Sequence, residues 1–396
     1  MNNAVIVDVV RTPSGKGKPG GALFGVHPAE LLATVLRELV SRNDIDPALV
    51  EDVITGCVGQ GGEQSINIGR TAVLAAGFPE TVPATTVDRQ CGSSQQAAQF
   101  AAQAIMAGTC GVVIAAGVES MSRVPMFSQV MGKDPNVAPL RHRFPDGLVA
   151  QGISAELLAV RWKLDRARLD EFAARSHRLA ATVAAAEAAR QVVPVEVVDS
   201  DGNRRTMTTD ETVRPATTVE GLATLSPVFR DDAIAVRFPE IDWRITAGNS
   251  SPLTDGASAA LIMSETTAAA LNLTPRARFH SFVVTGSDPL LMLDGVLAAT
   301  EKVLGRAGLG IDDIDAYEVN EAFAPVPLLW EKHFGTDPDK LNPAGGAIAL
   351  GHPLGASGGR LLASLVNHLE STGGRYGLQT MCEGGGMANA TVIERL

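Results

Sequence analysis

Short apolar runs alternate along most of this chain with segments whose apolar residues recur at helical spacing. Residues 5–10 and 53–58 predict buried strands. Residues 27–43 predict a helix, because Leu32, Val35, Leu36 and Leu39 fall on one side of it. This alternation favours an α/β fold with buried strands. Further strands are expected at residues 85–87, 112–116, 256–264, 315–319 and 377–381, and further helices at residues 66–76, 92–107, 166–190, 321–330 and 356–370.

The composition narrows the class of protein. Of the 396 residues, 45% are hydrophobic and 19% are charged, which allows a large core and argues against disorder. The net charge is -11 and no long basic run is present, so a nucleic-acid partner is not expected. Since no run of about 18 apolar residues occurs, no membrane span is expected either.

The cysteines indicate a reduced setting. Cys57, Cys91, Cys110 and Cys382 form no CxxC pair, so we expect neither a zinc site nor a disulfide framework. The N-terminal apolar run has no basic segment before it and predicts a strand rather than a signal peptide. The ending VIERL is not a peroxisomal address, and a cytoplasmic location is expected.

The alternation is interrupted between residues 119 and 247. This stretch is rich in Pro, Met and polar residues and then carries a long Ala-rich helical segment. We interpret it as an inserted lobe that covers a site. The segments before and after it each contain a turn with a reactive residue, a small-residue helix and an apolar strand that ends in Gly, which suggests a weak internal repeat.

Cys91 lies between a predicted strand and a predicted helix, in the segment VDRQCGSS. The free N–H groups and the dipole of a helix N-terminus stabilise a thiolate, and the same N–H groups can bind an oxyanion formed on a thioester. The alternative is a buried structural cysteine. Position alone leaves both interpretations open.

Three further polar residues lie at chain turns. Glycines before His352 and Pro353 after it hold the histidine on a tight turn, where it can act as the base of a thiol. Cys382 ends an apolar strand and is the first residue of the segment CEGGG, in which three glycines follow closely. Its thiol could exchange protons with a carbon acid. Asn320 ends another strand and could hold a water or a carbonyl oxygen. The alternatives are a histidine that hydrogen-bonds its own loop, a core cysteine beside a glycine hinge, and a helix cap at Asn320.

Together these segments resemble the thiolase family over nearly the whole chain. The segments that carry the resemblance are VDRQCGSSQQA, NEAFA, GGAIALGHPLGASGGR and CEGGG, in that order. The segment AGNSSPLTDGASA is similar to a further family signature, in which the serine that matches Ser251 contacts the pantetheine arm of coenzyme A.

The resemblance implies the five-layered α-β-α-β-α thiolase fold with two related βαβαβ-type halves. The first half would comprise residues 1–118 and 248–271, the loop domain over the active site residues 119–247, and the second half residues 272–396. It also implies a homodimer or a homotetramer.

The resemblance further implies the chemistry of an acyl-CoA C-acyltransferase in lipid metabolism, such as fatty acid β-oxidation. His352 would take the proton of Cys91, whose thiolate attacks the acyl carbonyl to form an acyl-enzyme. Cys382 would move the α-proton of acetyl-CoA. One oxyanion site would use His352 and a water on Asn320, and the other the N–H groups of Cys91 and Gly384. Acyl-CoA, acetyl-CoA and CoA would be the substrates, with no permanently bound cofactor.

Several positions depart from the pattern of many relatives. Gln151 stands where many have Met, Ser226 where many have Lys or Arg, and Glu383 where a small or apolar residue is common. Gln151, Met292 and Phe323 match positions that line the acyl pocket. The segment 293–295 together with Gln151 looks more like actinobacterial thiolases that accept bulky or steroid-derived acyl groups, which gives a hypothesis for the substrate.

Two other classes of function remain to be weighed. A ketoacyl synthase of the same superfamily would lack the second catalytic cysteine, so Cys382 argues against it. A non-catalytic acyl-CoA or sterol carrier of the same fold would be expected to lack one of the reactive residues, whereas all four are present.

Overall fold

The structure is a computed structural model and describes residues 3–198 and 202–396. Its strands are β1 (Ala4–Arg11), β2 (Gly15–Lys16), β3 (Asp52–Gly56), β4 (Ala84–Val87), β5 (Val112–Ser120), β6 (Val195–Val198), β7 (Arg204–Met207), β8 (Thr254–Ser264), β9 (Ala277–Gly286), β10 (Ala316–Val319), β11 (Tyr376–Glu383) and β12 (Met387–Arg395). Its α-helices are α1 (Pro28–Arg42), α2 (Ile68–Ala75), α3 (Ser93–Ala107), α4 (Ala138–Arg143), α5 (Gln151–Arg161), α6 (Arg166–Gln191), α7 (Val219–Ala223), α8 (Asp232–Arg237), α9 (Glu265–Ala270), α10 (Gly295–Ala307), α11 (Pro325–Phe334), α12 (Ala347–Leu350) and α13 (Ser357–Thr372).

The main sheet consists of two halves, each of which combines parallel and antiparallel strand pairs. Its order is β10-β11-β12-β9-β1-β8-β5-β3-β4, and β2 pairs with β8. In the first half β3 runs parallel to β4 and β5, while β8 is antiparallel to both β5 and β1. In the second half β10 is parallel to β11, and β12 is antiparallel to β11 and β9. A short pairing of β1 with β9 joins the halves.

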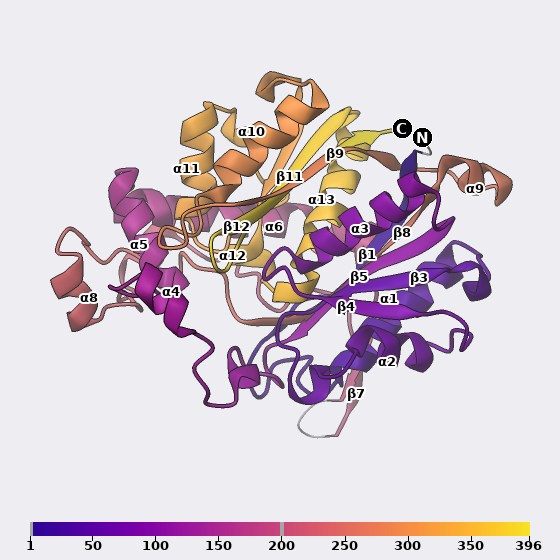
Figure 1. Cartoon of the computed structure of the whole chain (residues 1–396), viewed down its shortest axis with the longest axis horizontal. Coiled ribbons are helices and arrows are strands. Elements are labelled where there is room, and N and C mark those ends of the chain that lie inside the picture. Colours follow the sequence, from indigo (N-terminus) through magenta and orange to yellow (C-terminus); the bar gives the residue numbers. More distant parts are fainter. Residues whose placement is uncertain (1–2, 199–201) are drawn as a thin grey trace.

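The helices form three layers around these two halves. Helices α3 and α13 pack against each other and contact strands of both halves, so they form the central layer (Figure 1). Helices α1 and α2 cover the outer face of the first half, and α10 packs on β9, β11 and β12 of the second. The result is the α-β-α-β-α order, which confirms the predicted fold class.

The region between β5 and β8 adds helices rather than strands of the main sheet. It contains α4 to α8 and the separate hairpin of β6 and β7. Leu158, Leu169 and Phe172 of α5 and α6 are buried in the core of the second half. Helix α6 also packs on α12, which directly precedes the turn at His352.

One helix begins later than the sequence predicts. A helix is expected over residues 321–330, but α11 begins at Pro325 and its N-cap is Ala324. The side chain of Glu321 instead accepts hydrogen bonds from Asn342, Ser176 and the N–H of Ile348, which fixes an extended segment before the helix. Proline favours the first turn of a helix, so the helix starts there, and Asn320 does not cap it.

Glycines allow the segment after His352 to approach the first half closely. A Cβ atom at Gly56 would lie 2.5 Å from the amide of Ser94 and 2.8 Å from the carbonyl of Gly355. A Cβ at Gly117 would clash with the same carbonyl and lie 2.7 Å from the side chain of Ser94. The contact between β3, β5, α3 and the segment at Gly355 therefore has no room for a methyl group.

We predict that Gly117→Ala destabilises the protein by about 1–3 kcal/mol, the usual cost of overpacking a tight core. The matched control is Gly305→Ala, because Gly305 lies in α10 and a Cβ atom added there would meet no neighbouring atom within 4 Å. That control should be neutral or slightly stabilising, since Ala favours helices more than Gly does. Equilibrium urea unfolding measures both; equal stabilities would contradict the tight contact.

Candidate active site

Cys91 lies in the turn that joins β4 to the central helix α3. Gln90 before it has a left-handed backbone with φ 49°, and Gly92 after it is the N-cap of α3. The Cys91 side chain is buried, with 4% of its surface exposed. Burial, followed by the negative charge of Glu383, raises the pKa of the Cys91 thiol to about 12. The effect of burial on the thiol pKa therefore outweighs the stabilisation of the thiolate by the helix N-terminus. This thiol needs a base to react at neutral pH.

The geometry around His352 fixes which nitrogen of its ring carries the proton. The Ser357 hydroxyl donates to the carbonyl of Pro353 at 2.8 Å and lies 2.5 Å from Nδ1 of His352. Since the hydroxyl has a single hydrogen, it accepts from Nδ1–H, which leaves the lone pair on Nε2. Burial, with a smaller effect of the Arg360 charge, lowers the pKa of His352 to about 3, so the ring is neutral.

Asn320 lies beside the unprotonated nitrogen of His352, which can accept a hydrogen bond from the Asn320 amide. Its Nδ2 is 3.3 Å from His352 Nε2, and its backbone N–H donates to the carbonyl of Thr380 on β11. The side chain is buried, and within the described part of the chain its Oδ1 has no hydrogen-bond partner. An amide in this position can hold a water or a substrate oxygen next to the imidazole.

Cys382 lies near the end of β11, where the hairpin to β12 begins. It is fully buried, and burial raises the pKa of its thiol well above the usual value. The next largest effect on this pKa is the charge of Cys91, which raises it further. The hairpin turns through Gly385 and Gly386, whose φ angles of 81° and 76° favour glycine.

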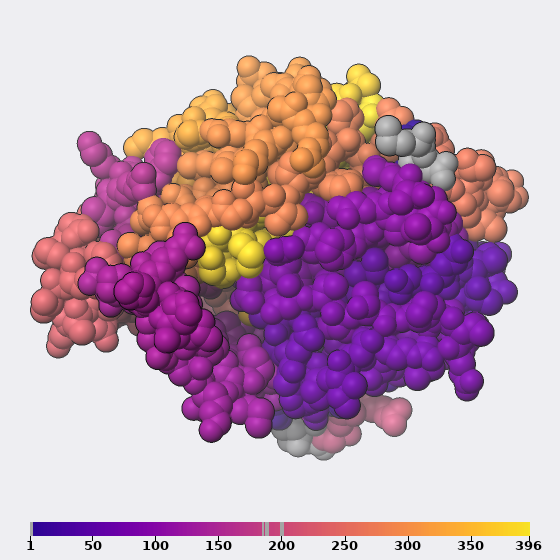
Figure 2. All heavy atoms as spheres, in the orientation of Figure 1, coloured from indigo at the N-terminus to yellow at the C-terminus, as the bar shows by residue number. Residues whose placement is uncertain are grey.

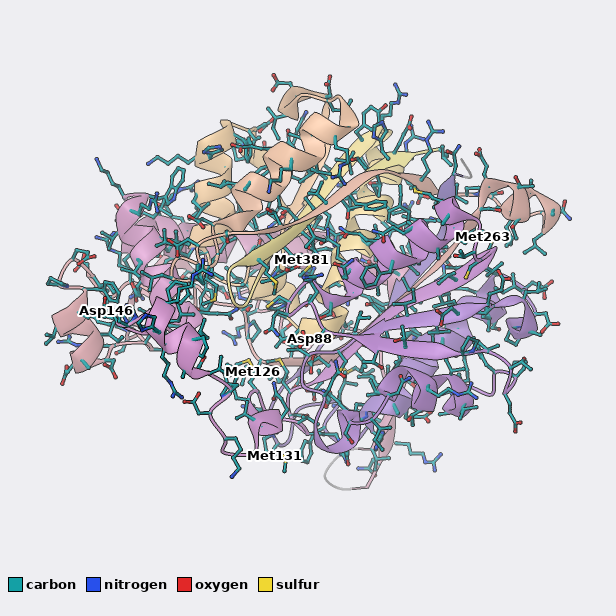
Figure 3. All side chains as sticks on the ribbon, in the orientation of Figure 1. Asp88, Met126, Met131, Asp146, Met263 and Met381 are labelled. Carbon is teal, nitrogen blue, oxygen red and sulfur yellow. The ribbon has the colours of Figure 1, made fainter. Side chains whose placement is uncertain are left out.

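A cavity of about 460 Å³ opens beside the Cys91 thiol. Cys91, Gln151, Met292 and Gly384 line it, together with Met126 and other residues before α5. Figure 2 shows a hollow between the magenta segment before α4 and the first half, with C-terminal residues in yellow at its floor. Figure 3 shows Met126 on that segment, with Asp88 and Met381 near the middle of the molecule.

The other residues predicted for the site do not line this cavity. Phe323 packs edge-to-face on Phe229 and shares a core cluster with Cys382 and Met292. The hydroxyl of Ser251 donates to the carbonyl of Ala322, directly after the Asn320 segment. Leu354 connects the histidine to the cavity, because it lines the cavity and packs against Cys91 two residues after His352.

Sequence reasoning missed two residues that hold the site together. The buried carboxylate of Glu119 accepts from the N–H groups of Val58, Gly59 and Gly355. Ser357 sets the tautomer of His352. A carboxylate within an apolar strand was the available signal for Glu119, whereas Ser357 gave none outside the GHPLGAS motif.

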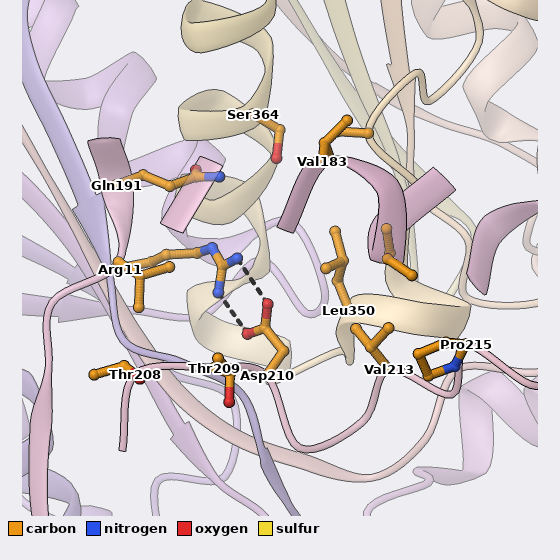
Figure 4. Close-up of a pocket in the computed structure, with 14 residues that line it drawn as sticks. Arg11, Val183, Gln191, Thr208, Thr209, Asp210, Val213, Pro215, Leu350 and Ser364 are labelled. Carbon is orange, nitrogen blue, oxygen red and sulfur yellow. Dashed lines mark hydrogen bonds and ion pairs between the residues drawn. The ribbon is translucent and has the colours of Figure 1, made fainter. Parts of the chain in front are cut away.

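A second cavity of about 240 Å³ lies away from these groups. At its wall Arg11 forms a bidentate salt bridge with Asp210, in which the two guanidinium nitrogens lie 2.7 and 2.9 Å from the two carboxylate oxygens (Figure 4). Leu350 and Val213 are among its apolar lining. None of the predicted catalytic residues lines it. Among the residues that the structure describes, no three His, Cys, Asp or Glu side chains gather to hold a metal ion, and no helix is long and apolar enough to cross a membrane.

Comparison with known protein families decides the class of this site. Residues 4–266 match the N-terminal domain of thiolase and residues 273–395 match its C-terminal domain. The chain belongs to the thiolase family. This thiolase is therefore an enzyme, an acyl-CoA C-acyltransferase, and the ketoacyl synthase and carrier alternatives are not favoured.

Individual relatives of this thiolase are similar over all or nearly all of their length. A steroid 3-ketoacyl-CoA thiolase of Mycobacterium tuberculosis is 46% identical, covering 100% of this chain and 95% of the relative. A 3-ketoacyl-CoA thiolase of Photobacterium profundum is 45% identical over 100% of both chains. The crystal structures of Bacillus anthracis acetyl-CoA acetyltransferase and human mitochondrial 3-ketoacyl-CoA thiolase each give a TM-score of 0.88, at 37% and 36% identity, and cover 100% of this chain and 99% of theirs.

We predict that His352→Ala slows alkylation of Cys91 by iodoacetamide at pH 7 by roughly 100-fold, the lower range of general-base assistance. The pKa of His352 lies near 3, so the wild-type rate should show no titration step near the usual histidine value of 6.5. Peptide mass mapping at several pH values measures the rate. His333→Ala on the surface is the control, and an unchanged rate in His352→Ala would contradict the role of the imidazole.

Proposed function

We propose that this thiolase cleaves 3-ketoacyl-CoA with CoA through an acyl-enzyme on Cys91, and that the same site can run the condensation in reverse. The observation that supports the proposal is a neutral His352 whose unprotonated Nε2 faces Asn320, in a chain that also buries two thiols, with the charge of Cys91 acting on Cys382. A base, a nucleophile and a proton donor are thus available for one thioester substrate.

The proposed cleavage begins when Nε2 of His352 takes the proton of Cys91. The thiolate attacks the 3-keto carbon, and the bond between C2 and C3 breaks. The electron pair leaves on C2 of acetyl-CoA, where Cys382 supplies a proton. The acyl group stays on the Cys91 sulfur until the thiol of CoA gives its proton to the Cys382 thiolate and attacks the acyl carbonyl. The bond to the Cys91 sulfur then breaks, Cys91 takes its proton back from His352, and the shortened acyl-CoA is released.

The protonation state of Cys382 supports its part in this sequence. Burial raises the pKa of its thiol well above the usual value, so the resting group carries the proton that the leaving carbanion requires. For the developing oxyanions we propose His352 with a water on Asn320 at one position and the N–H groups of Cys91 and Gly384 at the other. Each such donor is typically worth roughly 3 kcal/mol.

The composition of the cavity supports a bulky acyl group as substrate, including a steroid-derived one. Met121, Met126, Met292 and Met387 contribute to its wall. Methionine side chains adapt to irregular apolar shapes, and a volume of about 460 Å³ exceeds what an acetyl group needs. The Mycobacterium tuberculosis relative, a steroid 3-ketoacyl-CoA thiolase, points to the same class of substrate. We further propose that Phe323 shapes the inner end of this pocket and that Ser251 contacts the pantetheine arm.

We also propose that the enzyme works as a homo-oligomer in the cytoplasm. Its pathway would be of the fatty acid β-oxidation type. Residues 119–247 would act as a loop domain over the site. The exposed apolar side chains of Phe127 and Met131 support an interface, since 71% and 83% of their surfaces are accessible in the single chain. The free state of all four cysteines is consistent with a reducing compartment.

Replacing each of the two cysteines should block a different step of the reaction. We expect Cys91→Ala to abolish acyl-enzyme formation, because no nucleophile remains. Cys382→Ala should still be acylated by acyl-CoA, yet thiolysis should fall by roughly 100-fold or more, the usual worth of a positioned proton donor. Mass spectrometry of the intact protein detects the acyl-enzyme, and Cys110→Ala is the control. Full thiolysis by Cys382→Ala would refute its role.

The substrate range tests the acyl pocket. Across a panel of 3-ketoacyl-CoA substrates from acetoacetyl-CoA to a steroid side-chain derivative, we expect kcat/KM to be highest for the bulky members. Narrowing the cavity with Met292→Trp should lower kcat/KM for these members more than for acetoacetyl-CoA. A preference for acetoacetyl-CoA in the wild type would contradict the proposed specificity and leave the catalytic roles intact.

A further inference from the structure

Glu383 is a buried acidic residue next to both thiols. It follows Cys382 at the end of β11, so the alternation of a strand turns it to the opposite face, the side of Met381, which clusters with Cys91 and Leu361. Its Oε1 lies so close to Gly92, the residue after Cys91, that a Cβ atom there would clash with it. The carboxyl group therefore packs directly against the turn that carries the nucleophile.

The surroundings of Glu383 do not suit a carboxylate. The side chain has 0% exposure, and within the described residues neither of its oxygens has a hydrogen-bond partner. Beside it, Asn389 donates from Nδ2 to the carbonyl of Gly92 at 3.0 Å, while its buried Oδ1 has no partner. A carboxylate can only accept hydrogen bonds, whereas a carboxylic acid also has an O–H to donate. An unpaired buried carboxylate is costly, so this environment selects the acid.

We propose that Glu383 is a positioning residue that works as a neutral carboxylic acid, supporting the Cys91 turn, and that its loss of a proton suppresses the reactivity of both thiols. This inference rests on the proposed functions of Cys91 and Cys382.

The charged groups around Glu383 define its effect on pH dependence. From the turn before α3, Asp88 and Arg89 face it with opposite effects, and burial dominates and raises the pKa of Glu383 to about 9. A negative charge on Glu383 in turn raises the pKa of Cys91 and the pKa of Cys382. The protonated acid spares both thiols this repulsion at neutral pH, and the ionised group imposes it in alkaline solution.

Glu383→Gln separates this effect from plain packing, because glutamine resembles the acid in shape and cannot ionise. We expect the ratio of the Cys91 alkylation rate in Glu383→Gln to that in the wild type to rise about tenfold between pH 7 and pH 10, as for one unit of thiol pKa. For the exposed carboxyl control Glu301→Gln the ratio should stay flat. A ratio that is independent of pH, or that falls, would overturn the proposal.

Unfolding provides a second readout. Because folding raises the pKa of Glu383 from 4.5 to about 9, its contribution to stability is complete below pH 4.5 and is lost as the pH rises through about 9. The thermal unfolding midpoint of Glu383→Gln minus that of the wild type should therefore increase between pH 5 and pH 9. A difference that stays constant over this range would count against the proposal.

The wild type alone provides a test should the variant fail to fold. The logarithm of its Cys91 alkylation rate should rise by less than one unit per pH unit between pH 8 and pH 10, and a full unit slope would overturn the inference. Failure of the proposed function would look different: wild-type Cys91 would be unreactive, or acyl-CoA would not protect it. Failure of the Glu383 inference leaves a reactive and protectable Cys91.

Discussion

The buried carboxylate of Glu119 is the interaction on which the arrangement of this enzyme depends. It lies near the end of β5 and binds the N–H groups of Val58 and Gly59 after β3 and of Gly355 after His352. Burial raises its pKa, and these donors oppose that rise. Each buried N–H left without a partner would cost about 1–3 kcal/mol, so the carboxylate ties the histidine segment to the first half of the sheet.

Small residues make this connection possible. Gly56 and Gly117 leave space for the carbonyl of Gly355, and Gly358 and Gly359 bring α13 against α3 and β8. In an α-β-α-β-α arrangement the central helices must contact two sheet halves and each other, which bulky side chains would prevent. The same close packing gathers the start of α3, the segment at His352 and the end of β11 at one position.

The chemistry follows from what burial does to each group gathered there. It holds both thiols protonated and the imidazole neutral, so the resting site carries little charge and the proton positions are defined by hydrogen bonds. Ser357 directs the lone pair of His352 towards Asn320. A substrate thioester thus meets groups that are already oriented, and little reorganisation is required when charge develops.

The sequence by itself determined the local elements and the reactive residue types. Periodicity located α1 within residues 27–43 and most of the sheet strands, and the four motifs singled out Cys91, His352, Cys382 and Asn320. Only the tertiary structure decided the start of α11 at Pro325, the hydrogen bond from the Gly355 N–H to Glu119 and the burial of Glu383 against Gly92. These features depend on contacts between residues far apart in the chain, and on the loss of water around them, which a pattern of neighbouring residues does not encode.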